Sequence, residues 1–461
     1  MTTEVDISGG PHRPDERPAP PASPTPVPEA LRAALEAELD AAVELRHALH
    51  RDPRVSGDEA DSRDLVAAAL GAELEPVAGT GGMLRVGGPG PSVAVRAELD
   101  ALPVVERTDL PFASTAPPER PAAHVCGHDV HTAALVALTR AVRAVGPDAL
   151  PAPLLAVFQP REEAAPSGAA DVVVADEFRA HSPGAMLGVH VQPELPRGVV
   201  SARRGPVNAS SDEIEITVTG SAGHGGYPHR TRDPVLAVAA VVVALQQVVA
   251  RRVNPLQAGV VTIGQITAGS APNVVPGDAS ARGTVRALDA DRDAILDAVR
   301  EVVEHTARAH GCTGTVAVVP NEPAVVNDDT LTAAVAAALG GRRRGDRGER
   351  GDGGNPAGHG PTGLTLDTTF RSCGADDFSH YSAEGMPSAM LFVGTADHPL
   401  DGPGAVPGKA PGLHHPAFSP DDALVGEVAR ALLAAVVAAG HTLPAPSGTT
   451  PSGTAPPGES R

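Results

Sequence analysis

The segment from His124 to His131 carries one cysteine and three histidines between an expected loop and an apolar helix. Thiolate and neutral imidazole are preferred ligands of zinc and its first-row neighbours, and Cys126 and His128 are close enough to serve one site. A buried structural cysteine beside helix-capping residues would have the same local sequence. The segment therefore predicts a metal site only if the rest of the chain supplies further ligands.

Two adjacent carboxylates, Glu162 and Glu163, follow an apolar run from Leu154 to Phe158 that predicts a strand. Taken alone, they are typical of a charged loop. Near a thiol and imidazoles, one carboxylate can bind metal while the other accepts a proton from metal-bound water. Successive side chains at a strand end face opposite ways, so the two neighbours are able to act separately.

Two further histidines lie at positions where a metal site could use them. His190 stands at the end of an otherwise apolar strand, and His414 lies in a loop before the last helix. A lone histidine in such a strand is more often a satisfied core residue. Neither histidine identifies a site by itself, so their value depends on the fold bringing them near Cys126.

The composition indicates a globular protein that binds small molecules. A chain of 461 residues exceeds the size of one growing core, so we expect two domains. Hydrophobic residues make up 42% but aromatic residues only 2%, and tryptophan is absent, so Ala, Val and Leu must build the core. The formal net charge of −20 argues against a nucleic-acid partner.

The cysteine count and the ends of the chain bear on its location. Cys126, Cys312 and Cys373 are too few and too irregularly spaced for a disulfide framework, which favours a reducing compartment. The N-terminus is polar and rich in proline, unlike a signal peptide. We find no uninterrupted apolar run long enough to span a bilayer and expect no membrane association. The sequence predicts a cytoplasmic protein.

The first half of the chain alternates strands with helices. We predict a helix over Pro28–His50, strands over Ser92–Leu99, Leu154–Phe158 and Ala185–Val191, and a helix over His131–Val145. Continuous apolar strands that alternate with helices indicate a sheet covered on both faces, with parallel pairs in its middle. Polar residues just past the ends of such strands are natural site positions.

The pattern changes after Gly205, where Asp212–Thr219 alternates apolar and polar residues as a half-exposed strand does. The order of elements that follows, βαββαβ in all, predicts a compact inserted domain of the ferredoxin-like kind. Its further elements are a helix over Pro234–Arg251, strands over Gly259–Ile266 and Ala279–Leu288, a helix over Ala290–His310 and a strand over Thr315–Val319.

We therefore predict a discontinuous two-domain α/β protein with a cleft between its domains. Residues 28–205 and 320–443 form a catalytic domain around a mixed sheet, ending in a helix over Asp421–Ala439, and residues 206–319 form the inserted domain. Three stretches rich in Pro, Gly, Ser or Arg have the composition of disordered segments. They are the tails 1–27 and 444–461 and an insertion at 340–363.

Several short motifs occur in an order that resembles the dinuclear-metal amidohydrolases and peptidases. The closest resemblance is to the subgroup that contains hippurate hydrolase, N-acyl-L-amino-acid amidohydrolases and auxin-conjugate hydrolases, and it runs from about Leu31 to Leu443. The motifs are Arg96–Pro103, His124–Asp129, Gln159–Glu163, Gly188–His190 and Leu413–Pro416, with Gly223–His229, Pro272–Pro276 and Gly283–Arg286 in the inserted domain and Gly374–Ser379 after it.

The resemblance implies two divalent metal ions per subunit, with zinc, manganese, cobalt or nickel all compatible with the donor set. The ligands it implies are Cys126, His128, Glu163, His190 and His414, and the Cys126 thiolate would bridge the two ions. Glu162 would be the general base that takes a proton from the metal-activated water and passes it to the leaving amine.

The resemblance also implies supporting roles for four other residues. Asp100 would orient the metal ligands, although a buried salt bridge is the alternative. His224 would reach the site of a neighbouring subunit and stabilise the oxyanion, which requires a homodimer formed through the inserted lid domain. Asn273 and Arg286 are candidates for holding the free carboxylate of the substrate, although Arg286 could equally be a surface residue of a strand.

The chain departs from the family pattern in three places. Pro53-Arg54-Val55-Ser56 replaces the usual Pro-Glu-Leu, Glu98 stands where the subgroup often has Asp, and the insertion at 340–363 separates core elements. None of these changes removes an implied ligand or the base. They affect the expected substrate preference more than the expected hydrolysis.

The sequence thus predicts a metal-dependent amidohydrolase that cleaves the amide bond of N-acyl amino acids or similar small conjugates. A dipeptidase or an N-carbamoyl amidohydrolase of the same family is an alternative within the enzymes. A non-catalytic metal-binding or ligand-binding paralogue is the alternative outside them, motivated by the altered stretch after His50 and by the insertion. Glu162 and His224 argue against it, because a binding protein does not need both.

Overall fold

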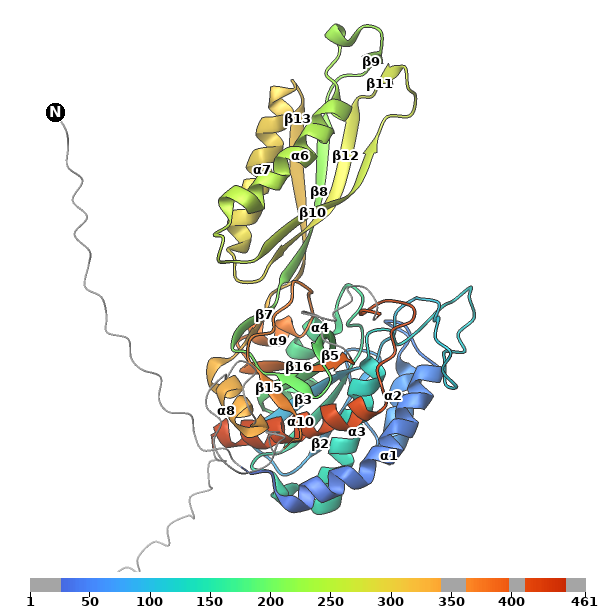
Figure 1. Cartoon of the computed structure of the whole chain (residues 1–461), viewed down its shortest axis with the longest axis vertical. Coiled ribbons are helices and arrows are strands. Elements are labelled where there is room, and N and C mark those ends of the chain that lie inside the picture. The colour runs from blue at the N-terminus through green and yellow to red at the C-terminus, as the bar shows by residue number, and fades with distance from the viewer. Residues whose placement is uncertain (1–25, 341–361, 398–410, 445–461) are drawn as a thin grey trace, which may run out of the picture.

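The computed structural model describes residues 26–340, 362–397 and 411–444. Within these ranges the chain forms a larger body and a narrower, elongated one, joined by the antiparallel pair β7 (Gly205–Asn208) and β14 (Val325–Asn327) (Figure 1). Nearly all of the predicted tails, 1–27 and 444–461, and of the predicted insertion at 340–363 lies outside the described residues.

The larger body is built on a mixed eight-stranded sheet, which confirms the predicted α/β class with a mixed sheet. Its middle strands β4, β3, β5 and β16 pair in parallel, and their near-continuous burial is the reason that they are continuous apolar runs. In spatial order the strands are β1 (Glu75–Val77), β2 (Gly81–Val86), β4 (Leu154–Gln159), β3 (Ser92–Glu98), β5 (Pro183–Pro196), β16 (Ser388–Ala396), β6 (Val199–Ser201) and β15 (Thr365–Asp367).

Helices cover both faces of this sheet, because alternate strand residues point to opposite sides. In β3, Val93 and Val95 belong to one hydrophobic cluster while Ala94 belongs to another. The first cluster packs against α1 (Glu29–Arg51), α2 (Ala60–Leu70), α3 (His128–Val145), α8 (Asp329–Leu339) and α10 (Ala423–Thr442), and the second against α4 (Gly168–Val174), α5 (Asp176–Ala180) and α9 (Ser379–Ala383).

Helix α3 begins at His128, so the predicted start at His131 is three residues too late. Gly127 precedes it with φ +90°, a conformation that L side chains rarely adopt, and a Cβ there would lie 2.4 Å from Cγ2 of Val191. Only glycine fits this turn. The turn places His128 and His131 in the first turn of the helix, where His131 contacts Glu98 at the end of β3 and Val191 within β5.

The elongated body consists of an antiparallel sheet with two helices on one face. In β8, Ile214, Ile216 and Val218 are buried beneath the helices while the intervening residues are exposed, as the alternating sequence requires. The strands, in spatial order, are β10 (Gly259–Ala268), β12 (Asp278–Ala287), β8 (Ser210–Thr219) and β13 (Thr313–Glu322), and the helices are α6 (Pro234–Arg252) and α7 (Arg292–Ala309).

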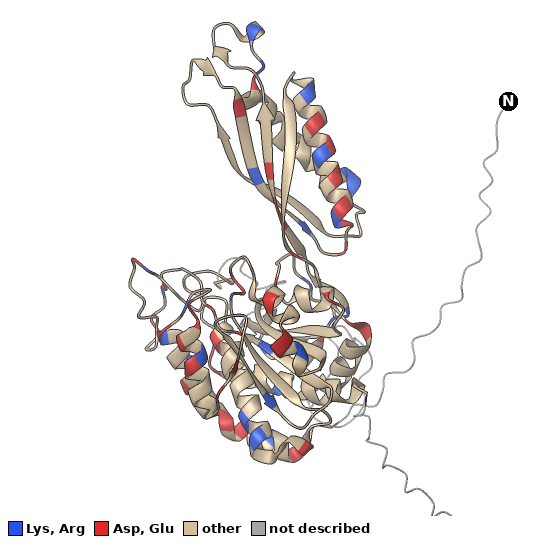
Figure 2. Ribbon diagram, turned by 180° about the vertical axis from the view of Figure 1, so that it is seen from behind, with Lys and Arg blue, Asp and Glu red and all other residues tan. Residues whose placement is uncertain are grey.

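The two helices of this body present different outer surfaces. The outward side of α7 carries charges of both signs, which is typical of a solvent-facing helix (Figure 2). Helix α6 buries residues such as Val241 and Leu245 against the sheet, but its other side exposes Leu236 at 60% and Val243 at 75%.

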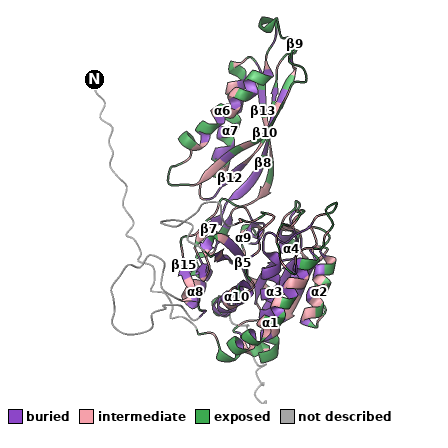
Figure 3. Ribbon diagram, turned by 45° about the vertical axis from the view of Figure 1, so that its right-hand side comes forward, coloured by how far each residue is buried: buried purple, intermediate pink, exposed green. Residues whose placement is uncertain are grey.

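By length and mean hydropathy, α6 and α10 could each cross a membrane. Neither is an uninterrupted apolar run, because Gln246 and Gln247 interrupt α6, and Glu427 and Arg430 interrupt α10. Burial explains the apolar composition of α10, because 83% of its most apolar window lies inside the larger body (Figure 3). Only 33% of the corresponding window of α6 is buried. The outer side of α6 is therefore the apolar surface that the described residues leave uncovered.

A buried ionic cluster joins α1 to the start of α3, which carries His128. The carboxylate of Asp129 accepts hydrogen bonds from Nε of Arg46 at 3.1 Å and from Nδ1 of His50 at 2.9 Å. On its other side, His50 contacts Glu106 at 3.2 Å. Burial disfavours the protonated imidazole, but the two carboxylates outweigh burial and raise the pKa of His50 to about 9.

This pKa shift predicts how stability depends on pH. Because the folded pKa of His50 lies above its unfolded value near 6.5, its contribution is full below about pH 6.5 and is lost as the pH rises through about 9. Relative to His50→Gln, wild-type protein should lose unfolding free energy across that window, at a slope of up to about 1.4 kcal/mol per pH unit.

Denaturant titrations of both proteins between pH 6 and pH 9.5 measure this difference. The matched control is His305→Gln, the same substitution at an exposed position of α7 that has no carboxylate partner among the described residues. A stability difference between wild type and His50→Gln that stays constant, or that grows with pH, would show that His50 is not held protonated.

Candidate metal centre

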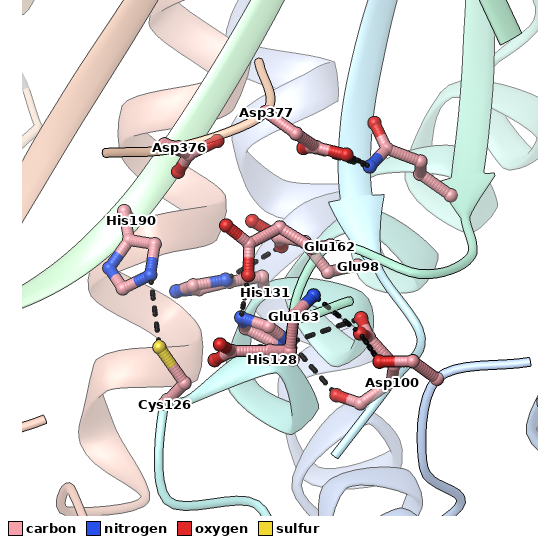
Figure 4. A network of polar contacts seen from close by, with 12 residues as sticks. Glu98, Asp100, Cys126, His128, His131, Glu162, Glu163, His190, Asp376 and Asp377 are labelled. Atoms are coloured by element: carbon pink, nitrogen blue, oxygen red, sulfur yellow. Dashed lines mark hydrogen bonds and ion pairs between the residues drawn. The ribbon is translucent and has the colours of Figure 1, made fainter. Parts of the chain in front are cut away.

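The predicted metal ligands come together at the carboxyl ends of the parallel strands (Figure 4). Cys126 lies in the loop before α3 and His128 is the first residue of α3. Glu163 follows β4, and His190 lies in β5. Neighbouring parallel strands end at one edge of a sheet, so side chains that are distant in sequence meet there. His414 reaches the same place from the loop before α10.

Hydrogen bonds to the backbone orient the two buried imidazoles. Nδ1 of His128 lies 2.8 Å from the carbonyl oxygen of Asp100, and Nδ1 of His190 lies 2.7 Å from that of Val191. A carbonyl oxygen only accepts, so Nδ1 carries the proton in each ring. Nε2 is then the free nitrogen, and in His190 it lies 3.4 Å from Sγ of Cys126. This is the tautomer that a metal-binding histidine needs.

Cys126 belongs to two groups whose possible ligand atoms all lie within 4.8 Å of one another. One group adds His128 and His190, and the other adds Glu163 and His414. Within the second group, Nε2 of His414 lies 3.1 Å from Oε1 of Glu163. Cys126 is the residue that these two groups share.

The donor atoms fit divalent metal ions. Nε2 of His128 and Oε1 of Glu163 are buried atoms without a hydrogen bond among the described residues, although buried polar atoms normally have a partner. The Glu163–His414 contact is short but does not have hydrogen-bond geometry. One thiol, three imidazoles and a carboxylate are a mixed donor set for zinc and other first-row ions.

The electrostatics of the site also call for cations. Burial raises the pKa of the Cys126 thiol well above its usual range, and the neighbouring Glu163, Glu162 and Glu98 raise it further. The pKa of Glu162 is likewise raised, first by burial and then by repulsion from Glu163 and Asp376. A bound cation reverses this effect and deprotonates a coordinating thiol.

Asp100 lies where an orienting residue should lie. Its Oδ2 accepts hydrogen bonds from the backbone N–H of Glu163 at 2.9 Å and from the hydroxyl of Ser56 at 2.7 Å (Figure 4). Burial opposes its charge, but hydrogen bonds from His128, Glu163 and Ser56 outweigh burial and lower the pKa of Asp100. It therefore contacts both a predicted ligand ring and the backbone of a predicted ligand.

A fully buried arginine at the same strand ends was not predicted as a site residue. Arg96, in β3, contacts Glu98 at 2.6 Å, Asp376 at 3.0 Å and Asp377 at 2.5 Å. The sequence signal was weak, because Arg96 and Asp376 were only members of motifs to which no separate role was assigned. An arginine within an apolar strand does not indicate which carboxylates it will contact.

His131 was likewise named in the metal-rich segment but given no role. Its Nδ1 donates to Oε2 of Glu98 at 2.8 Å, and its Nε2 accepts the backbone N–H of Val191 at 2.9 Å. It therefore connects the Arg96 cluster to the strand residue that follows His190. Glu98, noted as a departure from the family pattern, is the carboxylate that fixes this ring.

The three site residues predicted in the inserted domain lie elsewhere in the chain. His224 in β9 (Gly223–His224) and Asn273 beside β11 (Val274–Val275) occupy the tip of the elongated body, away from the metal centre (Figure 1). Arg286 lies near the opposite end of β12, which is about 25 Å along the strand, and donates to the carbonyl of Cys373 at 3.1 Å. One subunit therefore does not bring Asn273 and Arg286 to the same carboxylate.

Comparisons with known proteins agree with this geometry. The family model for peptidase family M20/M25/M40 matches residues 94–438. The chain is 30% identical over 391 residues to an N-acetyl-L-cysteine deacetylase of Bacillus subtilis (strain 168), covering 83% of this chain and 84% of that protein. It is 38% identical over 255 residues to an N-acetyldiaminopimelate deacetylase of Oceanobacillus iheyensis, covering 54% and 67%.

Two solved structures resemble the whole described chain. One is a putative aminohydrolase from methicillin-resistant Staphylococcus aureus, with a TM-score of 0.75 and 28% identity, covering 89% of this chain and 99% of that one. The other is a Bacillus subtilis protein described as a dinuclear metal binding peptidase, with a TM-score of 0.71 and 28% identity, covering 88% and 100%.

The raised pKa values predict that metal binding releases protons. At pH 7, loading metal-free protein with Zn²⁺ should release about one to two protons per subunit, because ligands must be deprotonated to bind. Isothermal titration calorimetry in buffers of different ionisation enthalpy measures the number. Cys126→Ser should lower it by about one. Heats that do not depend on the buffer would contradict the protonated state assigned to the thiol.

Proposed function

The chain belongs to peptidase family M20/M25/M40, and from that premise we propose that it is a metal-dependent amidohydrolase that cleaves N-acyl amino acids or similar small conjugates. The observation that carries the proposal is the position of Glu162. Its Oε2 lies 3.8 Å from Nε2 of His128, the nitrogen left free for a metal. The carboxylate that we propose as the base therefore lies beside the proposed metal ligands.

The residues present would hold two divalent ions, one with Cys126, His128 and His190 and the other with Cys126, Glu163 and His414. When bound, such ions supply an activated water and polarise the scissile carbonyl. Glu162 takes the proton of the attacking water and later delivers it to the leaving amine nitrogen.

One of the two observations that favoured a non-catalytic protein no longer supports it. The altered stretch after His50 contains Ser56, and its hydroxyl donates to Asp100, which in turn accepts from the backbone of Glu163. The stretch therefore supports the site instead of departing from it. A dipeptidase or an N-carbamoyl amidohydrolase differs from the leading function only in the acyl group, so a substrate panel separates them.

The elongated body, residues 206–319, would serve as the lid and dimerisation domain. The uncovered side of α6 exposes Val235, Leu236 and Val243, and α6 packs over β10, an edge strand that exposes Ile266 at 51%. An apolar surface next to an unpaired strand edge is the kind of surface that subunits bury. We assign it to a second copy of this chain.

A dimer of this kind would also explain why His224 and Asn273 lie at the tip of the elongated body. His224 and Asn273 lie far from their own metal centre, so they would act in the site of the partner subunit, with His224 donating to the developing oxyanion. Arg286, at the base of the lid, would bind the substrate carboxylate within its own subunit.

The cytoplasm remains the proposed location. Cys126 must be reduced to bind metal, and Cys126, Cys312 and Cys373 are all unpaired.

Substitution of the base tests the function. Glu162→Gln keeps the size of the side chain but cannot take a proton, so kcat should fall roughly 100- to 10,000-fold while metal content stays at the wild-type level. The assay is amine release from N-acetyl, N-benzoyl, N-carbamoyl and dipeptide substrates, after loading with Zn²⁺, Mn²⁺, Co²⁺ or Ni²⁺.

Glu44→Gln, an exposed substitution of the same kind on α1, is the control and should behave as wild type. Wild-type turnover that Glu162→Gln retains would remove Glu162 as the base. Full metal loading without turnover on any of these substrates would favour the ligand-binding alternative.

Mixing two inactive variants tests the shared site. His224→Ala alone should lower kcat about 100-fold. In a heterodimer with Glu162→Gln, the subunit that keeps Glu162 receives an intact His224 from its partner, so an equal mixture should regain about a quarter of wild-type activity. Each variant assayed alone gives the baseline.

Val243→Glu, placed in both variants, is the matched control, because a charge on the uncovered side of α6 should separate the subunits and abolish the recovery. Light scattering reports the oligomeric state of each sample. Mixtures that stay inactive although heterodimers form would exclude a role for His224 in the partner's site.

A further inference from the structure

Glu59 is a buried carboxylate that the proposed reaction does not yet use. Its side chain is fully buried, at the residue that precedes α2. A carboxylate in that position usually caps its own helix, but the Glu59 side chain makes no hydrogen bond to α2. Burying a carboxylate is costly unless its oxygens are satisfied, so its actual partners indicate its purpose.

Three donors from outside α2 satisfy this carboxylate. Oε1 accepts the backbone N–H of Gly57 at 2.7 Å and that of Arg161 at 2.9 Å, and Oε2 accepts the hydroxyl of Thr80. Gly57 belongs to the same loop as Glu59, and Thr80 immediately precedes β2. The third, Arg161, lies 102 positions later in the sequence and immediately precedes Glu162.

Arg161 adopts a backbone conformation that needs support. Its φ is +55°, in the left-handed region that non-glycine residues rarely occupy and that persists only where surrounding contacts hold it. The N–H of Arg161 goes to Glu59, and its carbonyl accepts the N–H of Gly168 at 2.8 Å. The turn at Arg161 decides the direction in which the next two side chains leave the backbone.

The backbone on the other side of Glu162 is held in the same way. The N–H of Glu163 donates to Asp100 at 2.9 Å (Figure 4). Buried carboxylates therefore hold the backbone directly before and directly after Glu162. The sequence required Glu162 and Glu163 to point in different directions. These two backbone hydrogen bonds provide a physical means of fixing that difference.

We propose that Glu59 is a positioning residue for catalysis, which holds Arg161 in its left-handed conformation and thereby aims Glu162 at the substrate water. The inference rests on the proposed function, in which Glu162 is the base. Asp100 alone does not supply this role, because it holds the peptide after Glu162 and leaves the turn before Glu162 free.

A competing explanation assigns the positioning to the guanidinium of Arg161. That group contacts Asp171 at 2.5 Å and the carbonyl of Pro166 at 3.0 Å. Asp171 is half exposed on α4 and does not contact the metal centre. Asp171→Asn therefore removes the charged partner of the side chain while leaving the hydrogen bond from the backbone N–H to Glu59 intact.

The test uses four variants of the metal-loaded full chain: Glu59→Gln, Arg161→Gly, the double variant and Asp171→Asn. In Glu59→Gln the charged oxygen that accepts the N–H of Gly57 and that of Arg161 becomes a neutral amide oxygen, which accepts both more weakly, so the turn at Arg161 loosens. We expect kcat to fall about 10- to 100-fold with KM within about 2-fold, since a displacement of about 1 Å has such an effect. Metal content should remain that of wild type.

Rescue separates positioning from a general structural effect. Glycine adopts φ +55° without support, so Arg161→Gly should make Glu59 dispensable. The double variant should return to within about 3-fold of Arg161→Gly alone, and Asp171→Asn should match wild type. If Glu59→Gln lowered kcat by destabilising the fold, glycine at position 161 would not restore the activity.

Several results would overturn the proposal. They are unchanged kcat in Glu59→Gln, loss of metal together with activity, absence of rescue in the double variant, or an Asp171→Asn defect as large as that of Glu59→Gln. If Glu59→Gln does not fold, Glu59→Asp, whose shorter side chain withdraws from the N–H of Arg161, is judged by the same criteria.

A crystal structure of each variant gives a readout that does not depend on turnover. In Glu59→Gln the φ of Arg161 should leave the left-handed region and the Glu162 carboxylate should move by about 1 Å or more. If Arg161 and Glu162 keep their wild-type positions in Glu59→Gln, the inference is overturned, whatever the activity of the variant. Wild-type protein without turnover, but with Glu162 displaced in Glu59→Gln, would instead count against the proposed function alone.

Discussion

The central constraint on this structure is a cluster of buried carboxylates at the ends of its parallel strands. The cluster has more acidic groups than the neighbouring arginine can neutralise. Arg96 is fully buried among Glu98, Asp376 and Asp377, and Glu162 and Glu163 stand beside it. Buried charges persist only when paired or when they bind metal. One guanidinium cannot balance all of these carboxylates, which is the physical reason that the site fits divalent cations. Burial raises the pKa of the Cys126 thiol, and the neighbouring carboxylates raise it further.

Much of the surrounding fold serves to fix atoms at this edge. Backbone carbonyls orient the rings of His128 and His190, and buried carboxylates grip the chain on both sides of Glu162. The apolar core supplies the rigid frame. The ion pair of Arg46 with Asp129 connects α1 to the start of α3, next to His128. Precise positions for a base and its ligands follow from these supports, because loops alone would not hold them.

The division into two bodies has a different consequence. The metal centre lies entirely in the larger body, whereas His224 and Asn273 are at the far tip of the other, and the outer side of α6 is apolar and uncovered. If a second copy covers that surface, the tip of one subunit becomes part of the site of the next. The chain would then be an enzyme whose oxyanion stabilisation depends on assembly, while its ligands and base do not.

The sequence by itself determined the α/β class, the donor types and the adjacent carboxylates, because periodicity and side-chain chemistry are local properties. It missed the start of α3 by three residues, since the turn at Gly127 depends on contact with Val191. Tertiary structure alone decided that Arg96 and Glu59 support the site. Their partners lie far along the chain, and only the packing of strands brings them within hydrogen-bonding distance.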